Sequence, residues 1–394
     1  MHWAGCCDKC LRYRSDDMRE RSMTDIADHV TNRPRDCETL ACTVEALLPK
    51  AERHAASLRI AAWPDYAPTP LLALPRLAHE CELAAVMVKD EGHRFGLGSF
   101  KALGGAYAVA MLAAGASKPP VFACATDGNH GRAVAWGAAQ AGARCIVFLH
   151  ARVSDAFAAA IAAFGAEIVR IPGTYDDAVR LCAATAERAG WTVVSDTAWP
   201  GYEAIPRMVM CGYALIADEI ADEYRGPAPT HVFLQGGVGG MAATLVAALA
   251  GRYATSMPRF VVVEPASAAC LLASARRGQI AAVRGPHETL AAGLACGEPS
   301  TLAWPILDAG TNDFIAVTEA AFAAAVRCLA RPKKGDPTII AGPSGAAGLA
   351  GVLAACGCPE TRTRLGLDAA SRVLVINTES DTDPKVYRQI WAEA

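Results

Sequence analysis

The chain has 394 residues, of which 53% are hydrophobic and 20% charged, so it contains ample apolar material for a folded core. A net charge of -3 offers no basic surface for nucleic acid or an acidic membrane, and no apolar run free of Gly or charge is long enough to span a bilayer. The 15 cysteines are an odd number scattered through apolar stretches, which indicates reduced core residues of a cytoplasmic protein and no disulfide framework.

The first 45 residues are charged and irregular. We therefore expect residues 1–45 to form a poorly ordered N-terminal extension outside the fold, and we see no apolar core of a secretion signal. Cys7 and Cys10 have a C-x-x-C spacing, but no second pair of ligands lies nearby, so no metal site is expected. Val44–Leu58 has helical patterning, and Tyr66–Leu71 is expected to be extended because residues before prolines avoid the helical region.

From residue 86 onward, candidate strands and helices alternate. The strands are mostly continuous apolar runs, as in strands that are covered on both faces. They are Val86–Lys89, Val121–Ala125, Cys145–Leu149, Ile168–Ile171, Thr192–Ser195, Val232–Gln235, Phe260–Glu264 and Val373–Asn377. Ala-rich helical stretches such as Gly131–Ala141 and Tyr175–Ala189 separate them. This order predicts an α/β fold with parallel sheets, whose ligands bind at the carboxyl ends of the strands.

One lysine, Lys101, lies between Phe100 and a run of small residues at the start of an expected helix. Burial beside glycines and an aromatic ring removes water from the ammonium group, lowers its pKa and makes the neutral amine accessible, as a Schiff-base lysine requires. The alternative is a surface lysine at a helix start, which is the commoner situation for this residue type.

A glycine-rich loop, Gly236-Gly237-Val238-Gly239-Gly240, joins the strand that ends at Gln235 to the next expected helix. Glycines allow backbone N–H groups to crowd around an anion, and the helix adds its positive N-terminal dipole. No lysine follows in the position that a nucleotide-binding P-loop requires. The loop therefore predicts a phosphate site, with a plain tight turn as the alternative.

A polar loop, Thr126-Asp127-Gly128-Asn129, follows the strand Val121–Ala125 and precedes a helix. Either Asp127 or Asn129 could simply cap that helix. Asp196 follows the strand Thr192–Ser195 in the same way, and it has the same alternative reading as a cap.

Taken together, Ser99-Phe100-Lys101, the glycine-rich loop and the Asn129 loop resemble the fold-type II pyridoxal 5'-phosphate (PLP) enzymes of the tryptophan synthase β-like superfamily. Within that group, the residues 94–107, Thr126–Asn129, Asp196–Trp199 and Ala292–Pro299 look most similar to the diaminopropionate ammonia-lyase family. The resemblance covers about Tyr66 to Pro384. Pro343 departs from it, because a glutamate is expected there, and this leaves substrate contacts of its loop open.

The resemblance implies a role for each of these residues. Lys101 would carry PLP, with Phe100 beside it, and Asn129 would bond the ring hydroxyl. The residues Gly236, Gly237, Val238, Gly239 and Gly240 would hold the phosphate. Thr378, after the last strand, would meet the pyridine nitrogen; the alternative is that Asp381 or Asp383 approaches the ring.

Two carboxylates fit a diamine substrate. Asp127 could act as a general base on the face opposite Lys101, so that Lys101 takes the Cα proton of the L-isomer and Asp127 that of the D-isomer. Asp196 or Asp127 could accept the β-ammonium group. The resemblance thus implies three catalytic residues, Lys101, Asp127 and Asp196.

The resemblance also implies two lobes, each with a mainly parallel twisted sheet flanked by helices, and an active site between them. A large PLP-binding domain would comprise residues 46–117 and 206–394, and a small domain residues 118–205. The implied reaction is the PLP-dependent conversion of 2,3-diaminopropionate to pyruvate and two ammonia by a homodimer. A serine/threonine dehydratase of the same fold is one alternative, and a non-catalytic PLP-fold binding protein is another.

Overall fold

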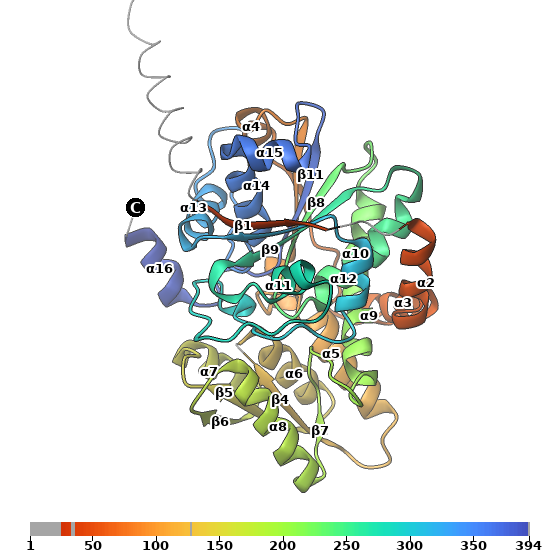
Figure 1. Ribbon diagram of the computed structural model, residues 1–394. Coiled ribbons are helices and arrows are strands. Elements are labelled where there is room, and N and C mark those ends of the chain that lie inside the picture. The colour runs from red at the N-terminus through yellow and green to blue at the C-terminus, as the bar shows by residue number, and fades with distance from the viewer. Residues whose placement is uncertain (1–24, 33–35, 127, 393–394) are drawn as a thin grey trace, which may run out of the picture.

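The computed structural model describes residues 25–32, 36–126 and 128–392. Two separate sheets organise this part of the chain (Figure 1). The strands of the larger sheet are β1 (Ile26–Thr31), β2 (Leu71–Ala73), β3 (Ala85–Asp90), β8 (His231–Gln235), β9 (Arg259–Pro265), β10 (Asp313–Val317) and β11 (Arg372–Asn377). The smaller sheet contains β4 (Val121–Thr126), β5 (Arg144–His150), β6 (Glu167–Ile171) and β7 (Thr192–Val193).

The larger sheet has the strand order β1-β10-β9-β8-β11-β3-β2. Its five inner strands run parallel, and the two edge strands β1 and β2 pair antiparallel to their neighbours. The smaller sheet has the order β6-β5-β4-β7 and is parallel throughout. The predicted α/β class with two mainly parallel sheets is confirmed.

Helices cover both faces of the sheets. They are α2 (Cys37–Leu47), α3 (Lys50–Ala61), α4 (Pro75–Glu80), α5 (Ala102–Ala114), α6 (Asn129–Gln140), α7 (Asp155–Ala162), α8 (Tyr175–Ala189), α9 (Ala204–Glu223), α10 (Gly240–Arg252), α11 (Cys270–Arg277), α12 (Trp304–Gly310), α13 (Glu319–Ala330), α14 (Ala347–Gly357), α15 (Pro359–Leu365) and α16 (Pro384–Ala392). Among the described residues, no helix is both long and apolar enough to cross a membrane.

The strand β9 shows why the strands of these sheets are continuous apolar runs in the sequence. Phe260 and Val262 point into the hydrophobic cluster that contains α9 and α10, whereas Val261 and Val263 point into the cluster that contains α13 and α14. Side chains alternate between the two faces of a strand, so a strand with helices on both faces must be apolar at every position. The same alternation holds in β11, where Leu374 and Val375 lie on opposite faces.

The N-terminal segment differs from its prediction. Residues 1–45 were expected to lie outside the fold, but Ile26–Thr31 forms the edge strand β1, and α2 contributes Leu40 and Val44 to the core beside α10 and α12. Only Ile26 and Val30 of this strand pack against the core, and polar residues lie between them in the sequence, so no continuous apolar run marks the strand. Residues 1–24 lie outside the described part.

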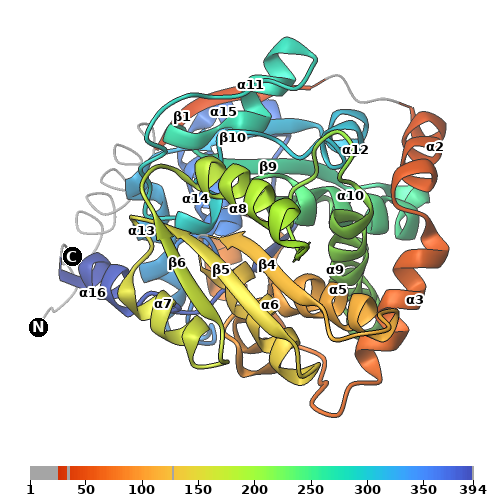
Figure 2. The same cartoon turned by 90° about the horizontal axis from the view of Figure 1, so that it is seen from below.

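The smaller sheet and its helices α6, α7 and α8 occupy the lower part of Figure 1 and face the viewer in Figure 2. All four strands of this sheet fall between residues 118 and 205, and those of the larger sheet fall outside that range. The exact domain boundaries 46–117, 118–205 and 206–394 stay a prediction. Helix α5, which follows Lys101, packs against α6 of the smaller unit and α9 of the larger one.

Candidate active site

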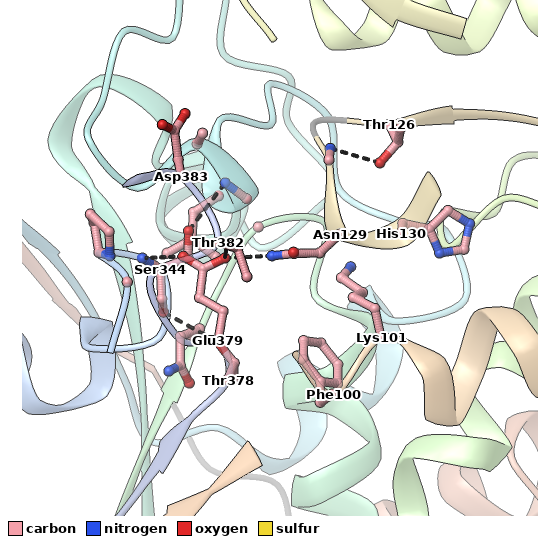
Figure 3. Close-up of a pocket in the computed structure, with 18 of the residues that line it drawn as sticks. Phe100, Lys101, Thr126, Asn129, His130, Ser344, Thr378, Glu379, Thr382 and Asp383 are labelled. Atoms are coloured by element: carbon pink, nitrogen blue, oxygen red, sulfur yellow. Dashed lines mark hydrogen bonds between the residues drawn. The ribbon is translucent and has the colours of Figure 1, made fainter. Parts of the chain in front are cut away.

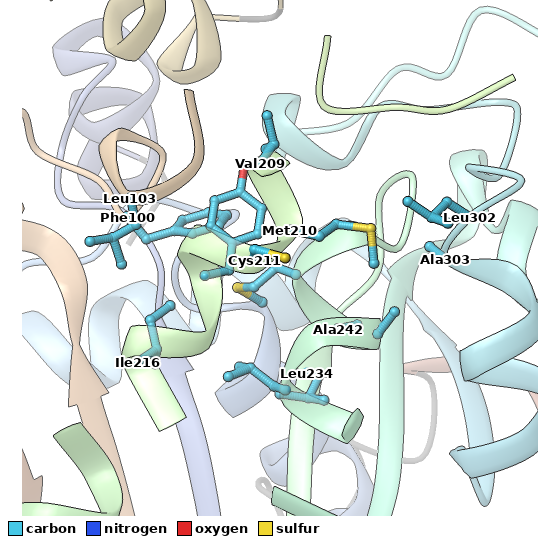
Figure 4. Packing of buried hydrophobic residues seen from close by; sticks show 14 of the residues in the cluster. Phe100, Leu103, Val209, Met210, Cys211, Ile216, Leu234, Ala242, Leu302 and Ala303 are labelled. Carbon is cyan, nitrogen blue, oxygen red and sulfur yellow. The ribbon is translucent and has the colours of Figure 1, made fainter. Parts of the chain in front are cut away.

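The lysine segment is held in place by its own backbone and by the last strand. After β3, a 3-10 turn (Glu91–Gly96) leads to Gly98, whose φ of 73° is a conformation that favours glycine. Phe100 then donates its N–H to the carbonyl of Thr378 at 3.1 Å, and Lys101 immediately precedes α5. The side chains of Phe100 and Leu103 join a core shared with α9, α10 and β8 (Figure 4). The position of Lys101 is therefore fixed by buried packing on both sides.

Behind this segment lies a buried ionic network. The guanidinium of Arg94 contacts Glu91 at 2.7 Å and Glu219 of α9 at 2.7 Å, and Lys89 contacts Glu219 at 2.6 Å. All four side chains are at least 95% buried. Buried charges remain ionised only when they are paired in this way, so the network ties the lysine segment rigidly to α9.

Lys101 and Asp196 form an ion pair in the centre of the site. Lys101 Nζ donates to Asp196 Oδ2 at 2.5 Å, and the hydroxyl of Tyr175 donates to Asp196 Oδ1 at 3.1 Å. His130 Nδ1 lies 3.8 Å from Asp196 Oδ2. Asp196 thus accepts hydrogen bonds from the lysine segment and from α8, with the His130 ring of α6 nearby, and it is placed as the counter-charge of Lys101.

The pKa of Lys101 differs in direction from the sequence-based expectation. Burial acts to lower the pKa of the Lys101 ammonium, as expected, but the Asp196 carboxylate outweighs it and raises the pKa above its ordinary value. Burial likewise acts to raise the pKa of Asp196, and Lys101 and His130 lower it below its ordinary value. The pair is therefore ionised in this structure, and the prediction of a lowered lysine pKa is wrong because it could not include this partner.

The loop after β4 positions Asn129. The hydroxyl of Thr126 accepts hydrogen bonds from the N–H groups of Gly128 at 2.9 Å and Gly131 at 3.0 Å, which turns the chain into α6. Asn129 is the first residue of that helix, and its Nδ2 donates to Glu379 Oε2 at 2.5 Å. Asn129 Oδ1 is buried and has no partner among the described residues. Asp127 lies outside the described residues.

The glycine-rich loop lies between β8 and α10. Gly237 and Gly239 have φ values of 64° and 94°, conformations that side chains rarely adopt. A Cβ atom at Gly236 would lie 2.5 Å from Glu264 Cγ, so a side chain there would have to displace its neighbour. Within the described chain, the N–H groups of Gly237 and Val238 make no hydrogen bond, which leaves them available to an anion.

Thr378 follows β11, and its hydroxyl donates to the carbonyl of Ser344 at 3.3 Å. Gln235, at the end of β8, donates to the carbonyls of Gly345 and Ile376 and joins the same loops. The carboxyl ends of β8 and β11 thus meet at one edge of the sheet, as expected for a ligand site in a parallel sheet.

The pocket brings nearly all the candidate residues together. Its lining includes Phe100, Lys101, Asn129, Asp196, Gly236, Gly237, Val238, Gly240 and Thr378. Gly239 lies in the same loop but is not part of the lining. Asp381 and Asp383 also line the pocket, so their approach to a ligand remains a second possibility. Figure 3 shows Lys101 and Asn129 pointing toward the same space.

Several polar lining residues were not assigned to the site from the sequence, among them His130, Tyr175, Tyr213 and Glu379. Glu379 directly follows Thr378 at the end of a strand, so its position was a usable signal. Tyr175 and Tyr213 lie within helices whose patterning shows only core packing, and no local signal distinguishes them.

These residues fit PLP. The unpaired N–H groups of Gly237 and Val238 suit a phosphate, the unpartnered Oδ1 of Asn129 faces a polar group that has to be supplied, and Lys101 offers an amine. An amine and a phosphate cradle that line one pocket match an aldehyde cofactor that carries a phosphate.

Comparisons with known proteins agree with this fit. Residues 62–379 match the family model described as pyridoxal-phosphate dependent enzyme. The diaminopropionate ammonia-lyase of Escherichia coli (strain K12) is 42% identical over 348 residues, which are 82% of this chain and 87% of the relative.

Two crystal structures of the Escherichia coli diaminopropionate ammonia-lyase are also similar. One contains an aminoacrylate-PLP azomethine reaction intermediate and has a TM-score of 0.86. The other contains D-serine and has a TM-score of 0.87. In both comparisons the identity is 38%, and the match covers 94% of this chain and 98% of the other.

Proposed function

Because this chain belongs to the pyridoxal-phosphate dependent enzymes and, among them, to the diaminopropionate ammonia-lyase family, we propose that it converts 2,3-diaminopropionate and water to pyruvate and two ammonia. The observation that carries the proposal is the placement of Lys101, its partner Asp196 and the glycine-rich loop around one pocket.

PLP, when bound, supplies an electron-withdrawing ring that stabilises negative charge at the substrate Cα. Lys101 holds the cofactor through its amine, with the ring of Phe100 at 5.3 Å from Nζ, and the loop Gly236–Gly240 binds the phosphate through backbone N–H groups. Asn129 would bond the ring hydroxyl of the bound cofactor, and Thr378 would meet its ring nitrogen.

The protons of the reaction are assigned to two residues. Lys101 takes the Cα proton of the L-isomer, and Asp127 takes that of the D-isomer from the opposite face. Supporting this assignment, Asp127 belongs to the loop that also positions Asn129, and that loop reaches the pocket through Thr126 and Gly128. Asp196 orients Lys101 and balances the charge of the substrate's β-ammonium group, which leaves as ammonia.

The proposal also includes the oligomeric state and the cellular location of the protein. A homodimer is supported by family resemblance, and a cytoplasmic location by the cysteines: the twelve within the described residues are all free thiols. Gel filtration with light scattering tests the dimer, and fractionation of the source cells tests the location.

The proposal is tested by measuring the ratio of ammonia to pyruvate that the reaction releases. Purified protein loaded with PLP is given D- or L-diaminopropionate or serine, and pyruvate and ammonia are measured in the same reaction. Two ammonia per pyruvate from the diamine, with serine turned over far more slowly, is the expected result. Lys101→Ala should abolish product formation. Preferred turnover of serine with one ammonia would instead identify a dehydratase, and absence of turnover with bound PLP would identify a binding protein.

A further inference from the structure

A second carboxylate, that of Glu379, lies in the same pocket and has no role in the reaction as described so far. Its side chain is buried, with 7% of the residue exposed, and it lines the space shared with Lys101 and Asn129. Glu379 follows Thr378 in the loop after β11, so it comes from the larger sheet and faces the smaller one.

The contacts of Glu379 fix its orientation. Oε1 accepts the N–H of Ser344 at 3.1 Å, and Oε2 accepts Asn129 Nδ2 at 2.5 Å and the Thr382 hydroxyl at 3.3 Å. A Cβ atom at Gly342 would lie 2.7 Å from Oε1, so the backbone there approaches the carboxylate closely. Figure 3 shows this arrangement, with the amide of Asn129 pointing toward Glu379.

The donors around Glu379 are all neutral. Among the described residues, no ion pair includes its carboxylate. Burial raises the pKa of Glu379 above its ordinary value, although the hydrogen bonds from Asn129 and Ser344 oppose that change. Burying a carboxylate without a cationic partner is costly, and the three neutral donors offset only part of that cost.

The carboxylate of Glu379 constrains the orientation of the Asn129 amide. An amide offers N–H groups on one side and a carbonyl oxygen on the other, and a carboxylate can only accept. Rotating the Asn129 amide by half a turn would place Oδ1 against Glu379 Oε2 and exchange a charge-assisted hydrogen bond for repulsion. Glu379 therefore engages one N–H of Asn129, while Oδ1 stays buried without a partner among the described residues.

We propose that Glu379 is a positioning residue for the proposed PLP reaction, acting through Asn129 by fixing which atoms of its amide face the cofactor. The inference rests on the proposed function. It assigns Glu379 no contact with the substrate and no proton transfer.

A double-mutant cycle tests the proposal. Glu379→Gln keeps the shape and can still accept the N–H of Ser344, but its own amide can meet Asn129 in either orientation. Asn129→Ala removes the group through which Glu379 acts. The readouts are the dissociation constant of PLP, measured by dialysis, and the pH midpoint of the visible absorption band of the loaded protein.

Glu379→Gln and Asn129→Ala should each weaken PLP binding about tenfold, the usual cost of a lost hydrogen bond to a charged group. They should shift the pH midpoint in the same direction. In the Asn129→Ala background, Glu379→Gln should change the dissociation constant by less than about twofold, the scatter expected where no coupling remains, and should leave the pH midpoint in place. Full additivity of the two substitutions, or an unchanged midpoint in Glu379→Gln, would overturn the proposal.

Two further measurements keep the outcome interpretable. Glu223→Gln is a control, since Glu223 also accepts a neutral donor, the N–H of Leu71 at 3.0 Å, and neither residue lines the pocket. This variant should leave the pH midpoint unchanged, and an equal shift would contradict a role specific to Glu379. If the wild-type protein forms no visible band with PLP, the proposed function fails; if the band forms and Glu379→Gln leaves it unaltered, only the positioning role fails.

Discussion

Lys101 Nζ lies 2.5 Å from Asp196 Oδ2, although the two residues are 95 positions apart in the sequence. This ion pair raises the pKa of the lysine against the opposing effect of burial. The reactive amine is thus kept charged by a residue from the smaller sheet's side of the pocket until another group takes its place.

Asp196→Asn removes that counter-charge. The pKa of Lys101 should then fall, because burial is left unopposed, and a larger fraction of the amine should be neutral near neutral pH. Cofactor-free Asp196→Asn should therefore attach added PLP with a pH midpoint below that of the wild type. Stopped-flow absorbance across a pH series measures this shift.

Tyr175→Phe is the matched control, since it removes the hydroxyl that donates to Asp196 at 3.1 Å and retains the charge. Its midpoint should lie much closer to that of the wild type. Equal midpoints for the wild type and Asp196→Asn would show that the ion pair does not control the amine.

Asp127→Asn should separate the two substrate isomers. A carboxamide cannot accept the Cα proton, so turnover of D-diaminopropionate should fall by a factor on the order of a hundred or more, while the L-isomer keeps most of its rate. Steady-state kinetics with each isomer measures the effect. Wild-type rates with both isomers in Asp127→Asn would refute the assignment of this residue as the second base.

Gly236→Ala should impair cofactor binding. The added Cβ atom would lie 2.5 Å from Glu264 Cγ, and the resulting displacement of the loop should weaken PLP binding roughly tenfold, the equivalent of a modest overpacking cost. Equilibrium dialysis of PLP measures the change.

Gly251→Ala serves as the control, because a Cβ atom there meets nothing within 4 Å and the residue lies in the last turn of α10. Its PLP affinity should match that of the wild type. If Gly236→Ala also binds PLP normally, the loop does not require its close approach to Glu264.

Glu219→Gln should destabilise the whole fold. It leaves the charges of Arg94 and Lys89 short of a buried partner, which typically costs about 3–5 kcal/mol of unfolding free energy. Urea unfolding of the cofactor-free protein measures this loss. By contrast, Arg144→Ala breaks the exposed pair with Glu167 and should cost less than about 1 kcal/mol.

The contribution of the network of Glu219, Arg94 and Lys89 to the free energy of unfolding should depend on pH. Burial acts to raise the pKa of Glu219, but Arg94 and Lys89 outweigh it and lower the pKa below 4.5. A carboxylate with a lowered folded-state pKa stabilises the protein above its unfolded pKa, and that contribution is lost as the pH falls through the folded value. The stability difference between wild type and Glu219→Gln should therefore shrink as the pH drops below 4.5, and a constant difference would argue against the pairing.

Local sequence patterns predicted the α/β fold class and the segments from which part of the pocket lining comes. Strands buried on both faces must be apolar at every position, so β4, β5 and β9 were visible as local runs. The glycine-rich loop and the Lys101 segment were recognisable because their chemistry depends on residues that are adjacent in the chain.

Tertiary structure alone decided which distant groups meet. The hydrogen bond between Asn129 and Glu379 joins residues 250 positions apart. The ion pair with Asp196 raises the pKa of Lys101, although the sequence predicted a lowered one. The strand β1 became evident only through its partner β10, because polar residues separate its two core-packed residues, Ile26 and Val30, in the sequence. Local patterns encode the burial of a segment, but electrostatic and hydrogen-bonding partners depend on how close the packed sheets bring side chains that the sequence keeps far apart.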